Sequence, residues 1–128
     1  MSGAERFLLL TAAGHRIALP YRQVAEVREP CSLSPVPGSP SWCCGVFHAT
    51  GQAVAVVDLA QYLGEAGMQQ AGRLVLLDRQ LGGLAMQVEQ VESLLLSASD
   101  RSLTVSGQAV AVWDGGELVQ EIAAAFSR

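Results

Sequence analysis

The segment from Trp42 to Gly64 constrains the fold most, because it joins a hairpin signal to a helix start. Apolar residues recur on both sides of the polar stretch HATGQ at residues 48–52. A Val-rich run then leads into Asp58, and Asp is a favoured residue at a helix N-terminus. The segment predicts two strands, a polar turn and a short helix over residues 59–63 that stops at Gly64. Such a hairpin favours a binding module.

Short apolar runs separated by turn residues predict further strands along the rest of the chain. They span residues 6–12, 16–19, 24–27, 74–77, 84–88 and 91–96, the last two being two strands or one bent strand. Residues 109–113 and 117–119 are predicted to pair as a hairpin across Asp114, Gly115 and Gly116. Residues 30–40, 65–72 and 97–102 are predicted as connections, and residues 122–126 as a short helix. About nine or ten short strands are typical of barrels or sandwiches.

One internal repeat is visible, GQAVAVVD at residues 51–58 and GQAVAVWD at residues 107–114. The first copy is predicted to enter the second arm of its hairpin, and the second copy the first arm. The two copies are therefore not expected to be structurally equivalent. Alternating Ala and Val is also easily matched by chance, so the repeat is not taken as a sign of duplication.

Composition narrows the class of protein. Half of the residues are hydrophobic and 16% are charged, which argues for a folded chain, and 128 residues fit one domain over residues 1–128. The net charge is −4, and the eight Arg are scattered with no Lys, so no basic run could follow a phosphate backbone. The apolar runs are shorter than the roughly 20 residues of a bilayer span, and residues 7–13 fit a first strand better than a signal peptide.

Three cysteines, Cys31, Cys43 and Cys44, suggest a compartment and a possible metal site. An odd number without regular spacing favours a reducing compartment, and we expect the protein in the cytoplasm. Thiolates with His48 would suit zinc. However, adjacent strand residues point to opposite faces, so Cys43 and Cys44 are poorly placed to share one ion. No metal or cofactor is expected.

Catalytic constellations can be assembled only from scattered residues. A hydrolytic triad would use Ser41, His48 and Asp58, and a thiol site would use Cys44 with His15. No G-x-S-x-G elbow supports the triad, and two histidines leave few candidates for a base.

The two tryptophans suggest either core packing or partner anchoring. Trp113 is expected in the core because its neighbours alternate with apolar residues. Trp42 follows the Pro-rich connection and is expected to be more exposed, where aromatic side chains often anchor a partner.

The order of these features resembles the CheW-like family, adaptor domains that couple chemoreceptors to the histidine kinase CheA. The resemblance is carried by FLLLTAAGHRIALPYRQVAEVRE, SPVPGSP, GVFHATGQAVAVVDLAQYLG and RLVLLDRQLGGLAMQVEQVESLL. It implies a mainly β fold of two SH3-like five-stranded β-barrel subdomains around a shared apolar interface, with short helical turns and a short C-terminal helix. It also implies a protein that is not an enzyme.

The resemblance assigns partner binding to one strand end and one hairpin. The residues are Glu26, Arg28, Gly45, Val46, His48, Thr50 and Gly51. The implied partners are a chemoreceptor-type protein, a CheA-type histidine kinase and other CheW-like domains, in chemotaxis or surface motility. Without the resemblance, the charges on residues 26 and 28 would be read as a solvated strand end.

This chain departs from the family pattern in the central turn. The family commonly has Arg before the turn Gly, and Thr50 lacks the donor fork that suits carboxylates. The chain is therefore read as a diverged member. Two alternatives stay open, an adaptor for a different protein partner and a small-molecule-binding or catalytic β-barrel with Cys44 or His48 as the reactive group.

Overall fold

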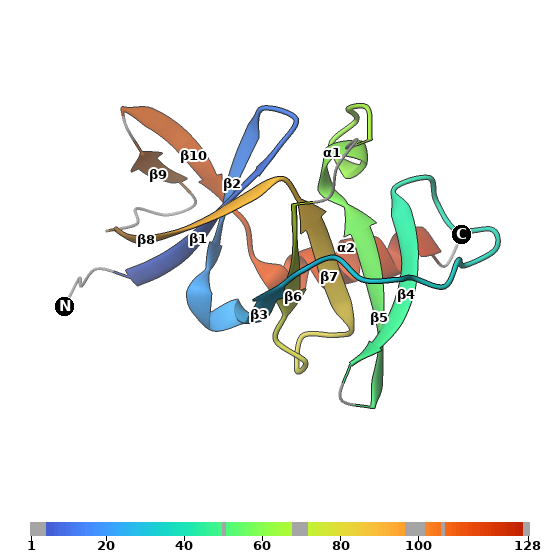
Figure 1. The fold of residues 1–128 in the computed structure, drawn as a ribbon. Helices are drawn as coiled ribbons and strands as arrows, with labels where there is room; N and C mark the ends of the chain where they lie inside the picture. Colours follow the sequence, from blue (N-terminus) through green and yellow to red (C-terminus); the bar gives the residue numbers. More distant parts are fainter. Residues whose placement is uncertain (1–4, 50, 68–71, 97–101, 106, 127–128) are drawn as a thin grey trace.

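The computed structural model describes residues 5–49, 51–67, 72–96, 102–105 and 107–126 (Figure 1). The described part is mainly β. Its strands are β1 (Glu5–Ala12), β2 (His15–Pro20), β3 (Val24–Arg28), β4 (Cys43–Ala49), β5 (Gln52–Asp58), β6 (Arg73–Leu77), β7 (Leu84–Val88), β8 (Gln90–Leu96), β9 (Ser102–Val105) and β10 (Gln108–Val112). The helical elements are a 3₁₀ turn η1 (Tyr21–Gln23), α1 (Leu59–Tyr62) and α2 (Gly115–Phe126).

The strands form two five-stranded sheets, which separate clearly in Figure 1. Sheet A has the order β8-β1-β2-β10-β9, and sheet B has the order β3-β6-β7-β5-β4. Within the described residues, no strand pairing joins the two edges of either sheet. The mainly β fold with two five-stranded units was predicted correctly, whereas closure of each unit into an SH3-like barrel is not confirmed.

The central strands are buried on both faces, which explains their continuous apolar runs. Alternate residues of β1 enter different clusters: Leu8 and Leu10 face a core shared by both sheets, while Phe7 and Leu9 face a cluster within sheet A. Sheet B has its own inner cluster around Phe47, Val56 and Leu74. The shared core also takes residues from α1 and α2, so both helices help to join the sheets.

The internal repeat occupies equivalent positions in the two sheets, contrary to the sequence expectation. Each copy forms the second arm of a hairpin, β4–β5 or β9–β10, and begins at a Gly with positive φ (76° at Gly51, 81° at Gly107). Each copy then pairs in parallel with the second strand of another hairpin, β7 or β2. Each ends in an Asp whose carboxylate accepts the backbone N–H three residues later. The repeat therefore marks equivalent strands, β5 and β10, in two sheets whose strands are arranged in the same way.

The predicted hairpin between residues 109–113 and 117–119 is wrong, because α2 begins directly after β10. The Asp114 carboxylate accepts the Glu117 N–H at 3.0 Å, as in a helix N-cap. Leu118 and Ile122, four residues apart, are both buried, and this spacing makes one apolar helix face. The partner of β10 is instead β9, which the sequence reading left unassigned.

Other sequence expectations are met closely. The β4–β5 hairpin runs into α1, the Asp58 side chain caps that helix, and Gly64 follows with φ 89°. β7 and β8 are two strands in different sheets, not one bent strand. The predicted turn at residues 97–102 lies outside the described residues except for Ser102, which begins β9.

Candidate functional site

The predicted partner-binding residues lie on the two edge strands of sheet B. Glu26 and Arg28 belong to β3, and Gly45, Val46 and His48 belong to β4. Gly51 is exposed in the turn after β4. Thr50, the remaining candidate, lies outside the described residues. In the order of sheet B, β3 and β4 are the farthest apart.

Side chains nevertheless bring these two edges together. The Arg28 guanidinium lies over the Phe47 ring, 5.3 Å from its centroid, a distance suited to a cation–π interaction. Glu26 lines a small hollow of about 70 Å³ with Ala49 of β4 and Arg79. We call the surface formed by residues 26, 28 and 46–48 the edge seam. Phe47 was not a sequence candidate, because its contact with Arg28 depends on the curvature of the sheet.

Gly45 lies in β4 next to the edge seam and allows another segment of backbone to pack closely. It is buried with φ 143°, and a Cβ there would lie 2.6 Å from the Ser34 carbonyl oxygen. Ser34 and Val46 exchange two backbone hydrogen bonds of 2.8 and 2.9 Å, so the Pro-rich connection covers the outer edge of β4. Figure 1 shows this connection crossing from β3 to β4. Gly45 thus permits the close approach, while Val46 and His48 stay nearer the surface.

A second surface lies on the other side of β3. Val27, 39% exposed, lines a groove of about 480 Å³ between the sheets. The groove also contains Val91 of β8, and its charged lining includes Arg73, Glu89 and Glu92. We call it the inter-sheet groove. The sequence reading missed it, although an apolar Val27 between charged neighbours was a usable signal.

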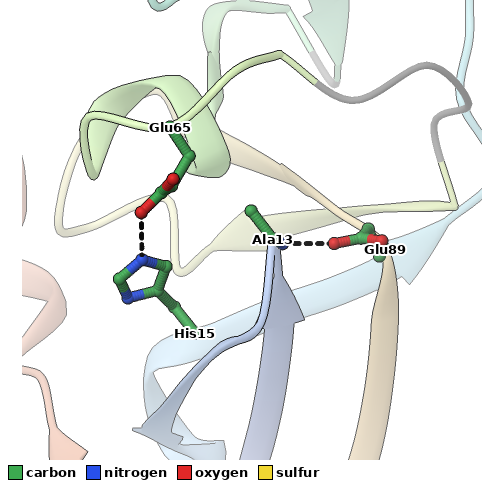
Figure 2. A network of polar contacts seen from close by, with 4 residues as sticks. All are labelled: Ala13, His15, Glu65 and Glu89. Atoms are coloured by element: carbon green, nitrogen blue, oxygen red, sulfur yellow. Dashed lines mark hydrogen bonds and ion pairs between the residues drawn. The ribbon is translucent and has the colours of Figure 1, made fainter.

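Two carboxylates fix the neighbouring end of β1 and β2 (Figure 2). Glu89, which lines the groove, accepts a hydrogen bond from the Ala13 N–H. Glu65, in the loop after α1, lies 2.9 Å from the His15 ring nitrogen Nε2. The β1–β2 turn is therefore tied both to the β7–β8 link and to the α1 loop of sheet B.

The residues proposed for catalysis and for a metal site include Cys44 and His48 of β4 and Asp58 of β5. Within the described ranges, no three His, Cys, Asp or Glu side chains are grouped to hold a metal ion. His48 pairs with Ala53, five residues before Asp58 along β5, which separates the two proposed triad members by about 17 Å at the rise of a strand. Burial, then the charges of Asp58 and Cys43, raise the pKa of the Cys44 thiol to about 11. A protonated thiol is a poor nucleophile at neutral pH.

Both tryptophans pack against the shared core. Trp113 and Trp42 are partly buried, and each makes an edge-to-face contact with Tyr62, at centroid distances of 6.3 and 5.3 Å. Core packing of Trp113 was predicted correctly. Trp42 is more enclosed than expected, because it also contacts Phe126 of α2 at 5.8 Å.

Comparison with known proteins gives one family and one fold. The family model described as CheW-like domain matches residues 6–115. No curated protein matches the sequence. Among solved structures, the scaffolding protein TtCheW from Thermoanaerobacter tengcongensis is similar with a TM-score of 0.73 and 14% sequence identity, over 88% of each chain. At this identity the likeness shows the fold. Neither helix in the described part of the chain is long and apolar enough to cross a bilayer.

Proposed function

Because the chain belongs to the CheW-like domain family, we propose that it is a non-enzymatic cytoplasmic scaffold that couples a chemoreceptor-type protein to a CheA-type histidine kinase. The family match over residues 6–115 and the fold shared with a scaffolding protein support this role. The observation that carries it is the position of β3 between two surfaces, the edge seam and the inter-sheet groove.

Alternation along β3 supplies the two surfaces. Successive strand residues point to opposite faces, so Glu26 and Arg28 serve the edge seam while Val27 serves the inter-sheet groove. One short strand can therefore contribute to two contacts without any side chain belonging to both. This is the arrangement that a coupling protein needs.

We assign the inter-sheet groove to a helix of the receptor-type partner. The groove has the apolar residues Val27 and Val91 in its lining, together with Arg73, Glu89 and Glu92. An amphipathic helix binds such a groove through apolar side chains at helical spacing, with polar contacts at the rim. Arg73 pairs with Glu29 at 3.3 Å, so a partner carboxylate at the groove would compete with Glu29 for its guanidinium.

We assign the edge seam to the regulatory domain of the kinase. It presents an arginine held over an aromatic ring, a carboxylate and an imidazole next to the β-branched Val46. Such a mixed surface, with the adjoining exposed Gly51, suits a polar protein contact. Other CheW-like domains are further candidates for this surface.

The mechanism is mass action. Once one partner is bound, the second binds within an assembly where its effective concentration is raised. The scaffold thus lowers the entropic cost of bringing receptor and kinase together, and no bond is made or broken.

The test uses purified protein, a kinase regulatory domain and receptor tip fragments in calorimetric titrations. We expect Val27→Asp to weaken receptor binding alone and Arg28→Glu to weaken kinase binding alone. Gln120→Glu, an exposed change on α2, serves as the control. Absence of binding to both partners at high micromolar concentration rejects the proposal.

A second candidate, an adaptor with different protein partners, is favoured by the sequence, which has Thr50 before Gly51 where the family commonly has Arg. It predicts that the same two surfaces are used but that chemoreceptor tips do not bind. Replacing Thr50 with Arg would then restore a donor fork for a receptor carboxylate.

A further inference from the structure

A third hollow lies at the junction of α1, the end of β10 and α2. Its volume is about 360 Å³, and its walls include Tyr62 of α1, Trp113 after β10, and Leu118 of α2. Three carboxylates also line it, those of Asp114, Glu117 and Glu121. We call it the aromatic pocket. It shares no residue with the edge seam or with the inter-sheet groove.

The aromatic walls are held in place. Tyr62 and Trp113 meet edge to face, with ring centroids 6.3 Å apart and ring planes at 74°. Trp42 also packs against Tyr62, with ring centroids 5.3 Å apart. The Tyr62 hydroxyl also bonds the Glu121 carboxylate, so this ring and this charge are fixed relative to each other. Few rotamers remain to be ordered when a ligand binds.

The charge of the pocket is negative. None of the described residues that line it is basic, against three carboxylates. Arg22 stands close enough to Asp114 to help lower the pKa of that carboxyl, after the larger effect of the Glu117 N–H. A lowered pKa keeps Asp114 ionised at neutral pH, so it adds its charge to those of Glu117 and Glu121, which lie one helical turn apart on α2.

The start of α2 does not make this an anion site. A helix N-terminus attracts anions through its unused N–H groups. Here Gly115 N–H donates to the Gln23 Oε1 at 2.7 Å, and Glu117 N–H donates to the Asp114 Oδ1 at 3.0 Å. Leu118 N–H donates to the Asp114 carbonyl at 3.0 Å. With these donors used, the pocket offers aromatic rings and carboxylates, which are complementary to a cation.

We propose that the aromatic pocket binds an arginine side chain from a basic segment of a partner protein. The planar guanidinium would lie against the Trp113 and Tyr62 rings, with its N–H groups directed to the carboxylates of α2. Arginine fits this set better than lysine, because it is more weakly hydrated, stacks on aromatic faces and carries several donors in a fixed plane. This inference stands apart from the proposed function, since it uses a different surface.

The test is an NMR titration of the full ¹⁵N-labelled chain, following the indole N–H signals. The probe is the peptide acetyl-Gly-Arg-Gly-amide, compared with peptides that carry citrulline or lysine in place of arginine. Citrulline keeps the shape and removes the charge. We expect a saturable shift of the Trp113 indole with the arginine peptide, and at least about fivefold weaker binding of the citrulline and lysine peptides.

Two variants with the same change in net charge locate the effect. Glu121→Gln keeps an acceptor for the Tyr62 hydroxyl, and we expect about fivefold weaker binding of the arginine peptide. Glu29→Gln, at an exposed carboxylate outside the pocket lining, should change binding less than about twofold. Equal binding of citrulline and arginine peptides overturns the proposal, as does an equal loss in the two variants. Lysine binding as tightly as arginine overturns the choice of a guanidinium.

Discussion

Replacing Asp114 with Ala tests the assignment of residues 115–126 to a helix that begins immediately after β10. The change removes the acceptor for the Glu117 N–H at 3.0 Å, and loss of an N-cap costs about 1 kcal/mol. It also removes a weak contact with the Gln23 amide at 3.4 Å. Because Leu118 and Ile122 of this helix belong to the shared core, fraying of its first turn lowers the free energy of unfolding of the whole protein.

The expected loss can be stated as a shift in melting temperature. The entropy of unfolding is about 2.1 cal/mol/K per residue, or about 0.27 kcal/mol/K for 128 residues. A loss of about 1 kcal/mol therefore lowers Tm by about 4 °C, measured by circular dichroism at pH 7. Asp114→Asn, which keeps a capping oxygen, should lose about half of this or less. The capped helix would be refuted if Asp114→Ala had the same Tm as the wild type. It would also be refuted if Asp114→Asn had a Tm as low as that of Asp114→Ala.

The same residue predicts a pH dependence. The Glu117 N–H is the largest of the effects that lower the pKa of Asp114 in the folded protein. The carboxylate then stabilises the fold fully above its unfolded pKa of about 3.9, and this contribution is lost as the pH falls through the lower folded pKa. The Tm difference between wild type and Asp114→Asn should stay constant from about pH 7 to pH 5 and shrink below about pH 4. A difference that changes mainly near pH 6 would contradict this cause.

Three further outcomes follow from the structure. Gly45→Ala should lower stability by about 2 kcal/mol in denaturant unfolding, because its φ is positive and its Cβ would meet the backbone of the Pro-rich connection; unchanged stability would show that this contact yields freely. A maleimide at pH 7 should modify the exposed Cys31 long before Cys44, whose pKa is raised to about 11, and mass mapping that finds Cys44 first would contradict its burial. Arg28→Ala should lower stability by about 1 kcal/mol or less, since it loses the cation–π contact with Phe47 and an exposed ion pair with Glu26 at 4.0 Å, yet weaken kinase binding strongly; a large stability loss would make this arginine structural.

Local signals predicted the parts of the fold in which they agree with one another. The hairpin before α1 was predicted because the turn Gly, the Val-rich strand and the capping Asp58 all specify the same structure. The equivalent segment around Asp114 was misread, because Asp followed by two Gly fits both a hairpin turn and a helix start. The buried spacing of Leu118 and Ile122 decides between them. Reading that helix as a strand placed the second repeat copy in the wrong hairpin arm, which was one of the two reasons for discounting the repeat.

The sequence assigned the candidate residues to their strands, but it did not show how these strands come together to form a surface. β3 and β4 are the two edge strands of sheet B and are separated by three other strands. Their contact through Arg28 and Phe47 depends on how sheet B curves. No sequence period encodes that curvature. The inter-sheet groove was missed for a similar reason, since Val27 and Val91 come to line one groove only when the two sheets pack together.

The central claim is that β3 supports two separate partner surfaces, so that receptor and kinase bind together. Sedimentation velocity of the protein mixed with saturating receptor tip fragment and kinase regulatory domain tests it most directly. The claim predicts a complex whose mass is the sum of all three components. Displacement of one partner by the other, with only two-component complexes at every ratio, would contradict it.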